Sequence, residues 1–161
     1  MKSLRQSESG FTIIEMVIVV TLVGVLASFA LSSFTSLRQS QQAKSASFEL
    51  YTSLSMARSE AIKRNNNVTL TPLVAGDWGK GWTVTTITPV TLAVETLRSQ
   101  AAMKGVTITP GGAGSVVFSR TGRVATSVSF QVDSSPVNVN VRRCVNIDLS
   151  GMPRANMGAC T

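Results

Sequence analysis

The sequence predicts an α+β protein in which one long N-terminal helix packs on an antiparallel β-sheet. Three observations predict this fold class: an apolar run near the N-terminus, a helical apolar stripe directly after it, and short β-rich segments beyond. One helix followed by strands, without βαβ alternation, is typical of an antiparallel sheet. The 161 residues are enough for one modest domain and an appendage.

The composition argues against most catalysis. The chain has 15 Lys and Arg, 8 Asp and Glu, 2 Cys and no His, which makes a net charge of +7. His is the commonest metal ligand and neutral-pH general base, and two Cys do not make a Cys-rich zinc site. The carboxylates of the head are scattered singly, without an acid–base pair. We therefore expect no enzyme activity, no metal and no cofactor.

Residues 16–37 contain no charged side chain. As a helix, such a run reaches roughly 33 Å, enough for a hydrocarbon core of about 30 Å. The short head before it carries Lys2 and Arg5 against Glu8, which favours a cytoplasmic N-terminus. We expect a transmembrane helix over residues 11–37 and an exported head over residues 38–161. An uncleaved anchor and a secretory signal are the alternatives, although the run is longer than a usual signal segment.

Glu15 stands at the entrance of this apolar run. A carboxylate at membrane depth costs about 2.5–3.5 kcal/mol on insertion scales, so it is usually kept for a reason. One interpretation is a capping box, in which Thr12 caps the helix and Glu15 reaches back to it. The other is that Glu15 meets a positive partner inside the apolar layer, such as the free amine of a chain that begins at Phe11.

The string Gly10-Phe11-Thr12-Ile13-Ile14-Glu15, before an apolar run and after a basic leader, resembles the processing region of type IV pilins and pseudopilins. The resemblance implies that prepilin peptidase removes residues 1–10 by cutting between Gly10 and Phe11. It also implies methylation of the new N-terminal Phe11 (N-methylphenylalanine) and a role for Glu15 in assembly. The implied partners are prepilin peptidase, other major and minor pilins, and the inner membrane. The head would be periplasmic before the subunit enters a fibre at the cell surface.

The helix is expected to continue from about residue 12 to residue 64. One apolar stripe recurs at intervals of three or four residues and consists of Ala43, Ala46, Leu50, Leu54, Ala57 and Ala61. Phe48, Tyr51 and Ile62 are expected to widen this stripe. Asn65, Asn66 and Asn67 then end the pattern. The stripe is typical of a face that packs on a sheet; a coiled-coil partner is the alternative.

After Asn67 the sequence becomes rich in Val, Thr and Ile, in short segments separated by Gly, Pro, Asp or Ser. We predict strands over residues 68–73, 82–87, 90–97, 106–108, 115–118, 127–132, 137–141 and 145–149. Gly111–Gly114 and Thr121-Gly122 are predicted turns.

Three short segments resemble the GspH/FimT group of minor pilins and pseudopilins: residues 56–64, 77–82 and 118–124. Together with the N-terminal string, this resemblance implies the type IV pilin fold. We interpret Trp78 and Trp82, which lie in the second segment, as packing residues rather than ligand-binding ones.

Cys144 and Cys160 enclose 15 residues near the C-terminus. Export to an oxidising compartment favours a disulfide, worth roughly 3 kcal/mol for a loop of this size. Two free thiols are the alternative. A disulfide here would resemble the C-terminal disulfide loop of many type IV pilins.

The same region is basic, with Arg142, Arg143 and Arg154 as candidate DNA-binding residues. Arg side chains on an exposed loop can bind phosphates. FimT-like pilins bind DNA through a C-terminal Gly-Arg-x-Arg stretch, and the matching place here, Gly151-Met152-Pro153-Arg154, keeps the Gly and the last Arg only. The departure favours a FimU-like structural role.

Three functions follow from these observations. The first is a minor pilin at the tip of a type IV pilus or priming its assembly. The second is a DNA-binding minor pilin that takes part in DNA uptake, and the third is a GspH-like pseudopilin of a type II secretion filament.

Overall fold

The computed structural model describes residues 10–112 and 114–160, apart from the side chains of residues 29–33. Residues 1–9 of the predicted leader lie outside the described residues. The chain divides into two compact units, Met1–Ser36 and Leu37–Thr161. The second unit, here called the head, contains all of the strands.

Helix α1 spans Ile13–Arg64, 52 residues. The predicted start at residue 12 and end at residue 64 are therefore confirmed to within one residue. At the C-terminal end, Asn65 adopts a φ of 50°, and Asn66 N–H donates to the carbonyl of Ala61. Because Asn tolerates the left-handed region better than most residues, the run of Asn ends the helix as expected.

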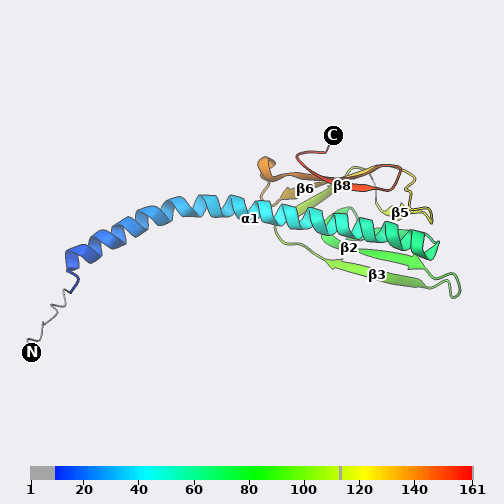
Figure 1. The fold of residues 1–161 in the computed structure, drawn as a ribbon, viewed down its shortest axis with the longest axis horizontal. Helices are drawn as coiled ribbons and strands as arrows, with labels where there is room; N and C mark the ends of the chain where they lie inside the picture. Colours follow the sequence, from blue (N-terminus) through cyan, green and yellow to red (C-terminus); the bar gives the residue numbers. More distant parts are fainter. Residues whose placement is uncertain (1–9, 113, 161) are drawn as a thin grey trace, which may run out of the picture. The chain divides into compact units, whose positions relative to one another are not determined.

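The strands form two antiparallel four-stranded sheets rather than the single sheet predicted (Figure 1). The first has the order β3-β2-β1-β5 and the second the order β4-β6-β7-β8. Their bounds are β1 (Val68–Val74), β2 (Asp77–Ile87), β3 (Val94–Ala101), β4 (Val106–Pro110), β5 (Val116–Phe118), β6 (Val128–Ser134), β7 (Arg143–Ile147) and β8 (Pro153–Met157).

The predicted strand over residues 137–141 was wrong, and the one over residues 90–97 was wrong in its first half, since β3 begins at Val94. The segment 137–141 contains a short 3-10 helix, η1 (Val139–Val141), because the Asn138 side chain accepts a hydrogen bond from Asn140 N–H at 3.1 Å and starts a turn. Residues 90–93 belong to the connection before β3. Sequence reasoning also missed β8, whose low β-propensity is outweighed by its pairing with β7.

The core lies between α1 and the two sheets. All six residues of the predicted stripe on α1 are at most 1% exposed, so that prediction is confirmed. Trp78 and Trp82 are fully buried, as a packing role requires. The ring of Trp78 on β2 meets that of Phe130 on β6 edge-on at 4.8 Å, so this aromatic pair joins the two sheets.

The predicted widening of the stripe was wrong for Phe48 and Ile62. Phe48 is 63% exposed and Ile62 is half exposed, whereas Tyr51 is half-buried. Phe48 lies two residues from both Ala46 and Leu50, which places it about 160° around the helix from them. Its side chain therefore belongs to a different face of α1.

Two of the segments that resemble the GspH/FimT group meet at one junction. Arg58 on α1 donates from Nε to the carbonyl of Gly122 at 3.1 Å. Gly151 approaches the same carbonyl so closely that a β-carbon there would lie 1.9 Å from it, and its φ is +77°. This junction attaches the turn before β8 to the turn after β5. The close approach and the positive φ explain in structural terms why position 151 is a Gly.

Candidate functional site

Glu15 lies in the first turn of α1 and forms a capping box with Thr12. Glu15 N–H donates to Thr12 Oγ1 at 3.3 Å, and Thr12 N–H donates to Glu15 Oε2 at 3.4 Å. Both contacts are longer than ordinary N–H···O hydrogen bonds, and the Glu15 side chain is exposed. The capping box expected from the sequence is therefore present in this structure. The Glu15 carboxylate nevertheless stays accessible to a positively charged group.

Apolar side chains are exposed at Phe11 and along the described part of α1 that precedes the head. Phe11 is 78% exposed and Ile13 is 87% exposed, and the large apolar side chains from there to Leu26 are all at least 46% exposed. Gly10 has no other atom within 4 Å of the place where a β-carbon would stand.

In the part of the chain that the structure describes, none of the helices has the length and apolarity needed to cross a membrane. The predicted span over residues 11–37 stays a prediction.

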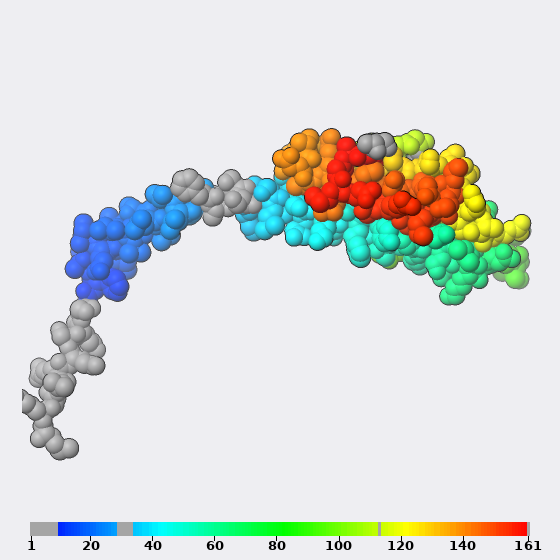
Figure 2. All heavy atoms as spheres, turned by 45° about the horizontal axis from the view of Figure 1, so that its top comes forward, coloured from blue at the N-terminus to red at the C-terminus, as the bar shows by residue number. Residues whose placement is uncertain are grey.

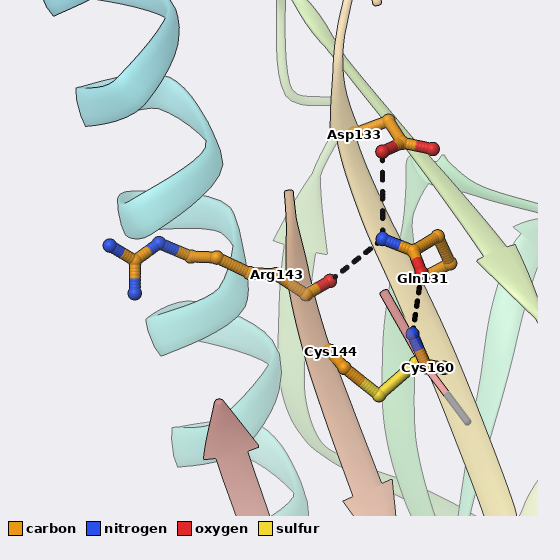
Figure 3. The surroundings of a disulfide bond; sticks show 5 residues. All are labelled: Gln131, Asp133, Arg143, Cys144 and Cys160. Atoms are coloured by element: carbon orange, nitrogen blue, oxygen red, sulfur yellow. Dashed lines mark hydrogen bonds between the residues drawn. A yellow bond between two sulfur atoms is a disulfide. The ribbon is translucent and has the colours of Figure 1, made fainter. Parts of the chain in front are cut away.

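The C-terminal segment is attached to β6 and β7 by covalent and polar contacts. A disulfide joins Cys144 to Cys160, which confirms that pairing (Figure 3). The amide of Gln131 reinforces it, because its Oε1 accepts from Cys160 N–H at 2.8 Å and its Nε2 donates to the carbonyl of Arg143 at 3.2 Å. The end of the chain is thereby held beside β6.

The structure separates the three candidate arginines. Arg142 donates from Nε to Asp133 at 2.7 Å and is partly buried in this ion pair. Arg143 instead points away from Gln131, toward α1 (Figure 3). Arg143 and Arg154 line a common groove on the head, whereas Arg142 is not among its lining residues.

This groove lies between α1 and the strands β7 and β8, and has a volume of about 680 Å³. Figure 2 shows the C-terminal residues, in red, lying beside the part of α1 drawn in cyan. Lys44, Phe48 and Tyr51 supply the helical wall, and Arg143, Pro153 and Arg154 supply the opposite one. We call it the α1–β8 groove.

Sequence reasoning missed the helical wall of the α1–β8 groove. Lys44, Phe48 and Tyr51 are spaced by four and three residues, so they share one helix face, which differs from the face of the buried stripe. That spacing was the available signal. Because Phe48 and Tyr51 are apolar, sequence reasoning assigned them to the buried stripe and not to a separate face.

The turn before β8 is ordered around Asp148. Its carboxylate accepts hydrogen bonds from the hydroxyl and the N–H of Ser150. The Ser150 hydroxyl, followed by backbone donors and the charge of Arg154, holds the pKa of Asp148 below its usual range. Gly151 N–H also donates to the Asp148 carbonyl at 2.9 Å. This turn fixes where β8 begins and so where Arg154 is presented.

Comparisons with known proteins find a match for the N-terminal segment and another for the head. Residues 5–31 match the prokaryotic N-terminal methylation motif, and residues 46–151 match the family of the type II transport protein GspH. A comparison with curated proteins finds no match.

Two kinds of solved structure share the fold. The type IV minor pilin FimU of Pseudomonas aeruginosa is 23% identical, with a TM-score of 0.61 over 70% of this chain and 91% of its own. The minor pseudopilin EpsH from the type 2 secretion system of Vibrio cholerae is 14% identical, with a TM-score of 0.58 over 72% of this chain and 97% of its own.

The fold and the N-terminal motif together define a subunit with the type IV pilin fold, a class that comprises minor pilins and pseudopilins. The chain belongs to the GspH family, since the family model covers residues 46–151. This is a family of structural subunits of the GspH/FimT kind, as the sequence predicts.

Proposed function

We propose that this chain is a minor pilin, a structural subunit at or near the tip of a type IV pilus that primes assembly. The observation that carries the proposal is a methylation motif at residues 5–31 followed by a GspH-family head at residues 46–151. The likeness in fold to FimU and the C-terminal disulfide loop support a pilus. The subunit is anchored in the inner membrane by its N-terminal helix, with a periplasmic head, until it enters the fibre.

In this proposal prepilin peptidase cuts between Gly10 and Phe11, and the new amine of Phe11 is methylated. The exposure of Gly10 and Phe11 supports access by an enzyme. The exposed apolar side chains of the N-terminal helix leave water when neighbouring helices surround them in the fibre. There the Glu15 carboxylate meets the Phe11 amine of a neighbouring subunit, so that two costly charges neutralise each other.

Mass spectrometry of the chain isolated from its own cells tests the processing step. We expect a mature protein that starts at a methylated Phe11. A Gly10→Val variant, which alters the residue before the cut, is expected to keep residues 1–10. A wild-type chain that still starts at Met1 would refute the processing and, with it, the proposal.

A pseudopilin of a type II secretion filament is the second candidate, favoured by the description of the family model and by the likeness to EpsH. The two candidates predict different locations for the mature subunit. A type IV pilus subunit is recovered with fibres sheared from the cell surface, whereas a subunit of a short secretion filament stays with the cell envelope.

A DNA-binding minor pilin is a third candidate, supported by Arg143 and Arg154 in one groove with Lys44. The ion pair between Arg142 and Asp133 removes one of the expected phosphate-binding groups. Binding of a duplex oligonucleotide at low salt tests this candidate, because phosphate contacts weaken steeply as salt rises. Absence of binding by the parent protein would eliminate it.

A further inference from the structure

The α1–β8 groove brings three cations of the head together: Lys44, Arg143 and Arg154. Lys63, Arg64, Arg98 and Arg142 form salt bridges with acidic residues of the same chain. Among the described residues, no salt bridge is formed by Lys44, Arg143 or Arg154, although the charge of Arg154 acts on nearby Asp148. Three cations that converge on one groove repel each other and are stabilised by an anionic occupant.

A second copy of this head is a poor source of that anion. Four of the head carboxylates are already held in salt bridges: Glu49, Glu60, Glu95 and Asp133. Asp77 accepts from Gly79 N–H, and Asp148 accepts from Ser150. With thirteen Lys and Arg against six acidic residues over positions 37–161, two copies of the head repel each other.

The apolar lining residues of the groove favour a protein over a nucleic acid as its occupant. Phe48, Tyr51, Pro153 and Ala155 are apolar lining residues, and Phe48 is 63% exposed. Interfaces with duplex DNA are more polar than interfaces between proteins, whereas four of the ten residues that line this groove are apolar. A volume of about 680 Å³ lies in the range that accommodates a few side chains.

We propose that the α1–β8 groove docks an acidic segment of a different subunit of the same filament, with apolar side chains on Phe48 and Ala155 and carboxylates on Lys44, Arg143 and Arg154. This inference rests on the proposed function only in taking the partner to be a filament subunit. The groove then selects a heterologous neighbour, and the positive charge of the head disfavours runs of this subunit in the filament.

Site-specific photo-crosslinking in the cells that make the filament tests this proposal. The full chain carries a photoreactive benzoylphenylalanine at position 48, and a second version carries it at the exposed position 90. We expect position 48 to form an adduct with a different pilin-type chain, and mass spectrometry to place the link in an acidic segment of that chain. We expect no such adduct from position 90.

Two triple variants with the same change in net charge distinguish an effect of the groove from an effect of the overall charge. The first combines Lys44→Glu, Arg143→Glu and Arg154→Glu, and the second combines Lys80→Glu, Arg120→Glu and Arg123→Glu at exposed sites outside the groove. Because like charges across an interface oppose docking, we expect the first variant to lower the adduct yield about tenfold or more and the second to leave it nearly unchanged. Formation of the Cys144–Cys160 disulfide in both variants checks that they fold.

Several results would overturn the inference. These are equal loss in both variants, an adduct with a second copy of this chain, no adduct at all, or protection of position 48 by a duplex oligonucleotide. Reversal of the crosslinked carboxylates to Lys in the partner should restore the adduct of the first variant, and failure to do so would also count against it. If the subunit is found in a secretion filament, the pilus assignment fails while the groove inference stands.

Discussion

Ser53 carries a fully buried hydroxyl. It lies on the core side of α1, is fully buried, and its Oγ has no partner among the described residues. Ser47, on the same helix, is also buried, but its Oγ donates to the carbonyl of Lys44 at 2.9 Å. The two serines therefore form a matched pair that differs in whether the hydroxyl is satisfied.

Replacement of Ser53 by Ala is expected to stabilise the head. Removal of an unpaired buried hydroxyl relieves a desolvation cost, and Ala favours the helix, so we expect a gain of about 1 kcal/mol. Urea denaturation of the full chain in detergent, followed by the fluorescence of buried Trp78 and Trp82, measures it. Ser47→Ala serves as the control and should gain less. A Ser53→Ala variant less stable than the wild type would contradict this account.

At the scale of elements, the contact between the turns at Gly122 and Gly151 holds β8 to the rest of the head. The junction combines a positive φ at both glycines with the hydrogen bond from Arg58. Because β8 supplies Pro153 and Arg154 to the α1–β8 groove, the junction also decides where that wall stands.

A Gly151→Ala substitution is expected to destabilise the head much more than Gly76→Ala. The two glycines have nearly the same φ, +77° and +79°, so the conformational cost of about 1–2 kcal/mol is shared. Only at Gly151 would the new β-carbon meet the carbonyl of Gly122, at 1.9 Å, whereas Gly76 has no atom within 4 Å. Urea denaturation midpoints of the two variants compare these costs. Equal midpoints would show that the junction has no stabilising role.

At the scale of the whole molecule, the Glu15 carboxylate is expected to have different partners in the single subunit and in the filament. In the structure Glu15 caps α1 together with Thr12. In the proposed filament it pairs with the Phe11 amine of a neighbouring subunit. The long capping contacts are consistent with this exchange, since weak hydrogen bonds are easily given up for a charged partner.

Glu15→Ala is therefore expected to impair incorporation into the filament without preventing membrane insertion. The loss of one partner of a buried ion pair typically costs about 3–5 kcal/mol. The amount of subunit in sheared filaments, relative to the membrane fraction, measures the effect.

Thr12→Ala is the matched control for Glu15→Ala. It removes the cap, at a cost of about 1 kcal/mol, and keeps the carboxylate. Equal defects in the two variants would mean that Glu15 acts as a cap, and normal incorporation of Glu15→Ala would remove its role in assembly.

Local patterns in the sequence determined the parts of the fold that depend on neighbouring residues. The stripe from Ala43 to Ala61 and the Asn run at residue 65 predicted α1 nearly to its ends, because helical period and termination are encoded within a few residues. The oxidising compartment expected for the head likewise made the pairing of Cys144 with Cys160 predictable.

Only the tertiary structure decided which distant residues meet. The split into two sheets and the pairing of β8 with β7 depend on contacts between strands, as does the junction of Gly122 with Gly151. Arg142 and Arg143 are adjacent in sequence, yet one pairs with Asp133 and the other lines the α1–β8 groove. The physical reason is that a side chain's partner is chosen by what the folded backbone brings within a few ångströms, and sequence spacing carries that information only along a single helix or strand.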